Sequence, residues 1–214
     1  MQSDYQRIHQ SQPRVFNYSL DWRFLLPVSK VDKIFVFLED DSDFSQTLEQ
    51  IGIPASNQLS FLDVEQKEKK DSASFVLPFG LPVRWVGKEQ TDQIEFFRSM
   101  RKLIGENGNL LVGFNNSLND RSSPQTKYHS STLRRVTSQL QKAGFKTIKV
   151  FGVVSNLNIP EYIFDLNAQS MYFALQHRFK RKSALLNLLQ LLSHTIGLTG
   201  ISYFLPCYFV LATV

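Results

Sequence analysis

Cysteine and histidine are scarce in this 214-residue sequence, which contains one Cys and four His. The single thiol, Cys207, excludes an internal disulfide and any zinc site built from several cysteines. Because the four histidines are scattered, we also expect no His-rich metal site, and the sequence predicts no bound metal. The first fifteen residues are polar and lack the apolar stretch of a secretory signal, which predicts a cytoplasmic protein.

Positive charge is in small excess: the sequence has 24 Lys and Arg against 19 Asp and Glu, which gives a formal net charge of +5. One basic run holds Arg178, Lys180, Arg181 and Lys182. A nucleic-acid surface would alternate such charges with aromatic residues, and this run holds only Phe179, so we expect no nucleic-acid partner. The run is interpreted as a solvated patch, with contact to an acidic partner or an anionic membrane surface as the alternative.

No apolar run is long and unbroken enough to be read as a membrane span. Residues 184–214 are very apolar, but Asn187, Gln190 and His194 recur at helical spacing and two glycines follow. A span needs about 20 apolar residues. We therefore predict a surface helix followed, over 201–214, by a terminal strand or hairpin. Since the basic run precedes this helix, an interfacial membrane helix is an alternative.

What the sequence does contain is enough apolar material for a core, at 43% hydrophobic residues. Residues 1–15 are predicted to form a polar arm, and residues 16–214 a single domain. Continuous apolar runs of strand length predict strands that are buried on both faces. The expected strands cover 33–38, 58–64, 74–78, 109–114 and 147–154, and the expected helices cover 42–50, 91–104 and 132–143. This alternation predicts an α/β fold with a mostly parallel sheet and helices on both faces.

Four segments carry a resemblance to a known family. They are 18–27 (YSLDWRFLLP), 107–112 (NGNLLV), the helix from 133 to the AGF of 143–145, and 158–162 (NIPEY). In this order they resemble the helix before the first strand, the strand after a PGG turn, the next helix and a later segment of class I S-adenosylmethionine-dependent methyltransferases. The similarity is to bacterial members associated with polysaccharide or secondary-product clusters. It covers residues 15–214 and implies a Rossmann-like sheet.

The sequence departs from that family where the cofactor would bind. The resemblance implies a turn of the pattern D/E-x-G-x-G-x-G after the first strand, whose glycines let the backbone approach the cofactor. Residues 39–43 (EDDSD) contain no glycine, and the first glycine of the chain is Gly52. We therefore predict a degenerate site without cofactor. The stretch is interpreted as the acidic start of a helix, and a metal site of Asp40, Asp41 and Asp43 is the alternative.

Five positions of this sequence match the cofactor site that the resemblance implies. They are Leu38, Glu39, Asp41, Asp63 and Phe79. Asp63, or Glu65 beside it, would correspond to the acidic residue that binds the ribose. The family has two strands and a helix where this sequence predicts only the strand 58–64, so one βα unit is predicted to be missing.

Other candidate residues follow the later strands. Asn115 and Asn116 end the strand that begins at 109, at the edge where open α/β sheets bind ligands, and are predicted to bind a substrate. The turn at 78–82 (PFGLP) is either a pocket wall or a rigid turn held by its prolines. His129 is a weak candidate for a general base. The sequence has no serine-nucleophile elbow, Walker A or HExxH motif.

The sequence thus predicts a methyltransferase-like protein that acts as a non-catalytic binding or partner subunit in a biosynthetic pathway. Its partner would be another protein or a second copy of the chain. An active methyltransferase that binds S-adenosylmethionine in an atypical way is the first alternative. A peripheral membrane protein that uses the basic run is the second.

Overall fold

A computed structural model describes residues 21–27, 33–38, 42–60, 73–83, 86–87, 89–118, 128–157, 160–167, 169–170, 174 and 205–214. Two short 3-10 helices are η1 (Asp21–Leu25) and η3 (Ala55–Asn57). The α-helices are α2 (Ser42–Gln50), α3 (Gln90–Ile104) and α4 (Leu133–Lys142). The strands are β1 (Ile34–Leu38), β2 (Gln58–Ser60), β3 (Ser74–Leu77), β4 (Asn109–Asn115), β5 (Thr147–Ser155), β6 (Pro160–Asp165) and β7 (Cys207–Thr213).

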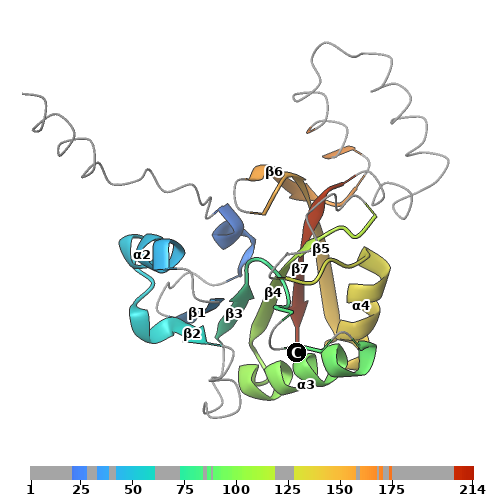
Figure 1. Cartoon of the computed structure of the whole chain (residues 1–214), viewed down its shortest axis with the longest axis horizontal. Helices are drawn as coiled ribbons and strands as arrows, with labels where there is room; N and C mark the ends of the chain where they lie inside the picture. The colour runs from blue at the N-terminus through green and yellow to red at the C-terminus, as the bar shows by residue number, and fades with distance from the viewer. Residues whose placement is uncertain are drawn as a thin grey trace, which may run out of the picture.

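The seven strands form one sheet in the order β2-β1-β3-β4-β7-β5-β6 (Figure 1). β1 pairs in parallel with β2 and β3, and β3 pairs in parallel with β4. β7 lies antiparallel between β4 and β5, and β6 is antiparallel to β5. Five of the seven strands therefore point the same way, which confirms the predicted α/β fold with a mostly parallel sheet.

The strands are buried on both faces, as their continuous apolar sequences predict. In β1 the side chains of Ile34 and Val36 enter one apolar cluster, while those of Phe35 and Phe37 pack in another. All four residues of β3 are buried, and so are the first six of β4. Because successive side chains point to opposite faces of a strand, each face of the sheet needs its own helical cover.

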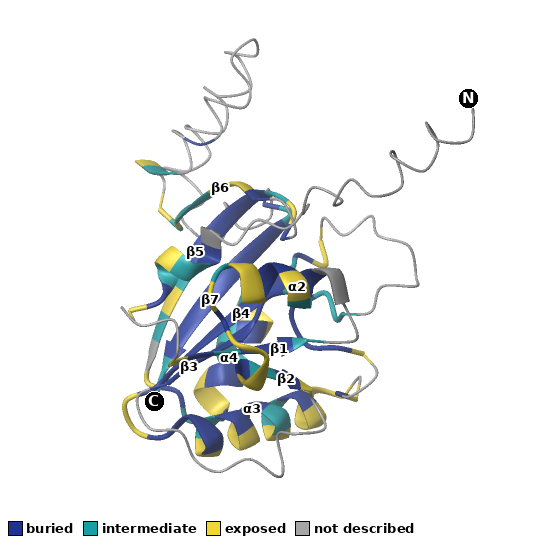
Figure 2. Cartoon of the chain, turned by 90° about the vertical axis from the view of Figure 1, so that its left-hand side faces the viewer, coloured by how far each residue is buried: buried dark blue, intermediate teal, exposed yellow. Residues whose placement is uncertain are grey.

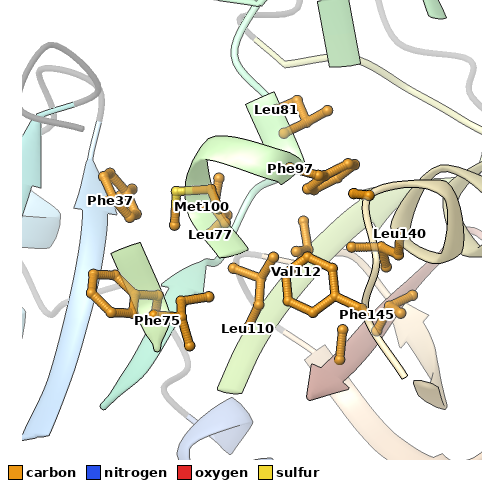
Figure 3. Close-up of a cluster of buried hydrophobic side chains, with 14 of the residues drawn as sticks. Phe37, Phe75, Leu77, Leu81, Phe97, Met100, Leu110, Val112, Leu140 and Phe145 are labelled. Carbon is orange, nitrogen blue, oxygen red and sulfur yellow. The ribbon is translucent and has the colours of Figure 1, made fainter. Parts of the chain in front are cut away.

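Helices α3 and α4 cover one face. On α3, Phe97, Met100 and Ile104 recur at helical spacing and are fully buried, and on α4 Val136 and Leu140 are buried in the same cluster (Figure 3). The outer side of α3 is exposed (Figure 2). Thr132 caps α4, since its hydroxyl accepts a hydrogen bond from the Arg135 backbone N–H at 3.3 Å.

The opposite face is covered by α2 and η1. Phe44 and Leu48 of α2 and Trp22 of η1 are each 1% exposed or less and share one cluster with Val36 and Val76. Gly52, at a φ of +88°, ends α2 with the left-handed backbone that a helix terminus favours. The predicted cover on both faces is thus confirmed.

The two ends of the sheet differ from a simple alternation of strands and helices. Between α2 and β3 the described residues hold one strand, β2, and residues 61–72 lie outside the described part of the chain, so the missing βα unit stays a prediction. At the other edge lies β6, a strand that the sequence did not predict. The C-terminal prediction of a strand or hairpin is met by β7, which lies inside the sheet. The arm at 1–15 and the helix predicted from 184 lie outside the described residues.

Candidate functional site

The order of the strands locates the edge at which a ligand would bind. From β1 the chain moves to β2 on one side and then returns to β3 on the other. Open α/β sheets bind ligands at such a reversal, outside the carboxyl ends of the two strands. Leu38 ends β1 and Phe79 follows β3, so the structure brings these two predicted cofactor residues to the same edge. Both pack, partly buried, against the cluster that contains Phe44.

Three aromatic rings, which we call the aromatic bridge, meet at this edge: Phe44, Phe79 and Tyr128. The ring centroids of Phe44 and Phe79 are 5.1 Å apart at an interplanar angle of 58°, and those of Phe79 and Tyr128 are 5.6 Å apart at 51°. Tilted pairs at these separations are each stabilised by about 0.5–1.5 kcal/mol beyond the area they bury. Because Phe44 lies on the helix after β1 and Phe79 on the turn after β3, the bridge spans the two sides of the edge.

The turn that carries Phe79 lies directly on the backbone of β4. Gly80 has a φ of +99°, which disfavours any side chain, and a Cβ on it would be 2.8 Å from the Gly113 carbonyl oxygen. A Cβ on Gly113 would in turn be 2.2 Å from the Pro78 carbonyl oxygen. The two glycines therefore allow a close approach that fixes the turn, and with it the position of the Phe79 ring.

Asn115 and Asn116 occupy the carboxyl end of β4, as predicted, but in different surroundings. Asn115 is half-buried. Asn116 is 1% exposed, its amide donates to the Leu205 carbonyl at 2.8 Å, and its side-chain oxygen accepts from the Leu118 N–H at 3.2 Å. The bond to Leu205 joins the end of β4 to the residues that precede β7. Asn115 is therefore the better placed of the two for the predicted contact with a substrate.

His129 is half-buried beside the turn at 78–82. Its Nε2 lies 2.9 Å from the Val86 carbonyl oxygen, and its backbone N–H donates to the Leu81 carbonyl at 2.8 Å. A carbonyl oxygen can only accept, so Nε2 carries a proton and Nδ1 is the basic nitrogen of the neutral ring. The geometry thus orients His129 in one tautomer, and its role as a general base stays a prediction.

Tyr208 and Ser131 were not found from the sequence, although both organise this region. Tyr208 is fully buried, and its hydroxyl donates to the Ser131 carbonyl at 2.8 Å. Ser131 in turn donates its backbone N–H to the Asn115 carbonyl at 2.9 Å, which closes the base of the loop after β4. Burial raises the pKa of the Tyr208 phenol, so the hydroxyl remains a donor. Because Tyr208 stands in an apolar run, its sequence context indicates only a strand.

Several predicted residues lie outside the described part of the chain. These are Glu39, Asp40, Asp41, Asp63, Glu65 and the basic run Arg178, Lys180, Arg181 and Lys182. Within the described ranges, no group of three His, Cys, Asp or Glu side chains could hold a metal ion. In the same ranges no helix is long and apolar enough to cross a membrane.

Cys207 is 1% exposed at the start of β7. Burial raises its pKa from 9.0 to about 12. At neutral pH the thiol is therefore protonated in the folded protein. Since the thiolate is the nucleophile, this environment disfavours reaction.

The raised pKa predicts a loss of stability in alkali. Above pH 9 the unfolded thiol releases its proton while the folded thiol keeps it up to about pH 12, so the unfolded state binds fewer protons. The free energy of unfolding should then fall with rising pH, by at most about 1.4 kcal/mol per unit from this group. Urea unfolding across this range measures the slope, and Cys207→Ala should flatten it. An identical slope in the variant would contradict the burial of the thiol.

Comparison with known proteins shows which solved structures this chain resembles. No family model matches the sequence, and neither does any curated protein. A SAM-dependent methyltransferase of Archaeoglobus fulgidus superposes with a TM-score of 0.53 at 11% identity, covering 98% of each chain. A Thermotoga maritima protein described as a SAM-dependent methyltransferase, possible histamine N-methyltransferase, superposes with a TM-score of 0.52 at 11% identity, covering 98% of this chain and 94% of its own.

These superpositions extend over nearly the whole chain. The fold is therefore that of class I methyltransferases, with a parallel part from β1 to β4 and an antiparallel part around β7. At 11% identity the comparison defines the fold, and the activity has to be argued from the site.

Proposed function

We propose that this chain is a methyltransferase-like protein with a degenerate cofactor site, which acts as a non-catalytic binding or partner subunit in a biosynthetic pathway. The observation that carries the proposal is the aromatic bridge. It places the Phe44 and Phe79 rings in contact between the elements that follow β1 and β3. That is the edge where this fold would hold the nucleoside of S-adenosylmethionine.

The packing of the bridge supports a closed edge. Phe44 is 1% exposed and belongs to the core cluster of α2, so its ring cannot swing away without opening that cluster. Phe79 is held by the turn that the close approach of Gly80 and Gly113 fixes. Displacing a buried aromatic side chain costs about 3–5 kcal/mol when it leaves a void. The binding energy of a cofactor would have to exceed this cost before the cofactor bound with any affinity.

The sequence of residues 39–43 adds a second argument in the same direction. It supplies four carboxylates and no glycine where the resembled family has a glycine-rich turn. Side chains at such a turn exclude a closely approaching ligand. Two like charges about 4 Å apart also repel by about 4 kcal/mol at an effective dielectric constant of 20, and the cofactor has a carboxylate of its own.

Calorimetry with S-adenosylmethionine and S-adenosylhomocysteine tests the proposal. We expect no binding of either compound by the unmodified chain at ligand concentrations up to ~1 mM. A variant with a glycine-rich turn at 39–43 and Phe79→Ala should gain measurable affinity, because both obstacles are reduced. The matched control is the same turn with Phe35→Ala, which removes a half-buried ring from the amino half of β1. Micromolar binding by the unmodified chain would refute the proposal.

The partner in this proposal is another protein or a second copy of the chain. Measurement of the mass in solution by light scattering separates the two. A dimer would support self-association, and a monomer would direct the search to a different protein. Either result is independent of the calorimetry.

An active methyltransferase is the second candidate, and the orientation of His129 favours it. With Nε2 donating to the Val86 carbonyl, Nδ1 is the nitrogen able to accept a proton from a substrate. Asn115 at the end of β4 would contribute a hydrogen bond to that substrate. The same calorimetry decides, since this candidate requires that S-adenosylmethionine bind.

A further inference from the structure

A pocket of about 360 Å³ lies at the opposite end of the sheet, against β6. Its walls are formed by Tyr162, Ile163, Phe164, Gln169, Ser170 and Ala174. Pockets that bind small molecules measure about 300–1,000 Å³, so its size suits such a ligand. From β3 to β6 the sheet advances by four strand positions, or about 19 Å at the usual spacing between strands. The pocket is therefore separate from the carboxyl edge between β1 and β3.

We infer that this β6 pocket binds a small, neutral, planar aromatic molecule that bears one or two hydrogen-bonding groups. Two of the six lining residues, Tyr162 and Phe164, supply aromatic rings, and such rings pack favourably against another aromatic ring in offset or tilted geometry. Gln169 and Ser170 supply an amide and a hydroxyl, which can each donate and accept. These two side chains would select a ligand with matching polar groups.

The chemistry of the described lining residues favours a neutral ligand. Among the residues that the structure describes, the six that line the pocket include none that is ionisable near neutral pH. Two acids flank the lining residues along β6: Glu161 is exposed to solvent, and Asp165 is paired with Lys149 at 3.1 Å. An ion in the pocket would gain no counter-charge from these six side chains, whereas a neutral molecule needs none.

The walls of the pocket are fixed by contacts outside it. Phe164 is the register partner of Gly152 on β5, and a Cβ on that glycine would be 2.8 Å from the ring. The ring therefore lies close to the β5 backbone at Gly152. After β6, the Asn167 side chain accepts the Ser170 backbone N–H at 2.8 Å, which holds the turn that carries Gln169 and Ser170. A pocket with fixed walls needs little ordering on binding, which favours affinity.

NMR titration with 2-naphthol, a neutral planar aromatic alcohol, tests the inference. We expect the methyl signals of Ile163 and Ala174 to shift, with a dissociation constant below about 1 mM. Ser170→Trp should weaken binding by about tenfold or more, because the indole would fill the pocket. Ser170→Leu is a smaller filling variant that should weaken it in the same direction. Gln141→Trp is the matched control, since Gln141 is exposed on α4 and its variant should bind normally.

Two further measurements define the outcomes. The anionic analogue 2-naphthalenesulfonate should bind at least about tenfold more weakly than 2-naphthol. Unshifted Ile163 and Ala174 signals in the unmodified chain would overturn the inference, and so would unchanged affinity in both filling variants. Equal affinity for the sulfonate would overturn the neutral class. These results do not depend on whether the carboxyl edge between β1 and β3 binds S-adenosylmethionine, so the two proposals stand or fall separately.

Discussion

Val210→Asp should strongly destabilise the native fold. Val210 is fully buried at the middle of β7, where its register partners are Val112 on β4 and Val150 on β5. A carboxylate there would be an unpaired buried charge, which costs roughly 3–5 kcal/mol or more. Since a domain of this kind is stable by only about 5–15 kcal/mol, the substitution should remove a large share of its stability. Circular dichroism during thermal unfolding measures this as a lost or much lowered transition.

The matched control is Val83→Asp. Val83 is 36% exposed, so the same substitution there places the charge in contact with water. We expect its transition to remain close to that of the unmodified chain. If Val210→Asp unfolds within a few degrees of this control, β7 does not occupy the centre of the sheet.

Gly113→Ala should destabilise the protein and displace the turn that carries Phe79. The added Cβ would be 2.2 Å from the Pro78 carbonyl oxygen, and a backbone group cannot rotate away as a flexible side chain does. Overpacking of a core costs typically about 1–3 kcal/mol. Chemical unfolding should therefore show a loss in that range or above it. The aromatic NMR signals of Phe79 should shift, because the ring moves relative to Phe44.

Gly52→Ala separates this clash from ordinary backbone strain. Gly52 has a φ of +88°, but a Cβ on it would have nothing within 4 Å. Its variant should lose about 1–2 kcal/mol through the left-handed backbone alone and leave the Phe79 signals in place. Displaced Phe79 signals in Gly52→Ala, or unmoved ones in Gly113→Ala, would contradict the assigned role of the turn.

The parallel part of the sheet was predictable because its signals are local. The run at 33–38 lacks polar alternation, and the spacing of Phe97, Met100 and Ile104 is that of one helix face, so both elements follow from neighbouring residues. β6 was missed because its sequence, PEYIFD, begins with proline and carries exposed acids at an edge. The position of β7 within the sheet was also not predicted, because an apolar run indicates a strand but not which strands it pairs with.

The candidate site was predictable to a smaller extent. The missing glycines at 39–43 indicate an altered cofactor turn, and the chain order brings Leu38 and Phe79 to one edge. The contact between Phe44 and Phe79 depends on how α2 packs against the turn after β3, which no local pattern encodes. Likewise, Asn116 looks like a free amide in the sequence, and only the tertiary structure shows that its side chain is bound to the chain before β7.

The place of β7 has a consequence for synthesis of the protein on the ribosome. β4 and β5 are joined only through β7, and roughly 50 residues lie between the end of β5 and its start. At ~5–20 residues per second, β5 and the earlier β4 are both synthesised about 3–10 s before β7. During that time each presents an open row of amide and carbonyl groups, which is the template on which nascent chains aggregate. A cell that makes this protein quickly would gain from a chaperone that covers those two edges.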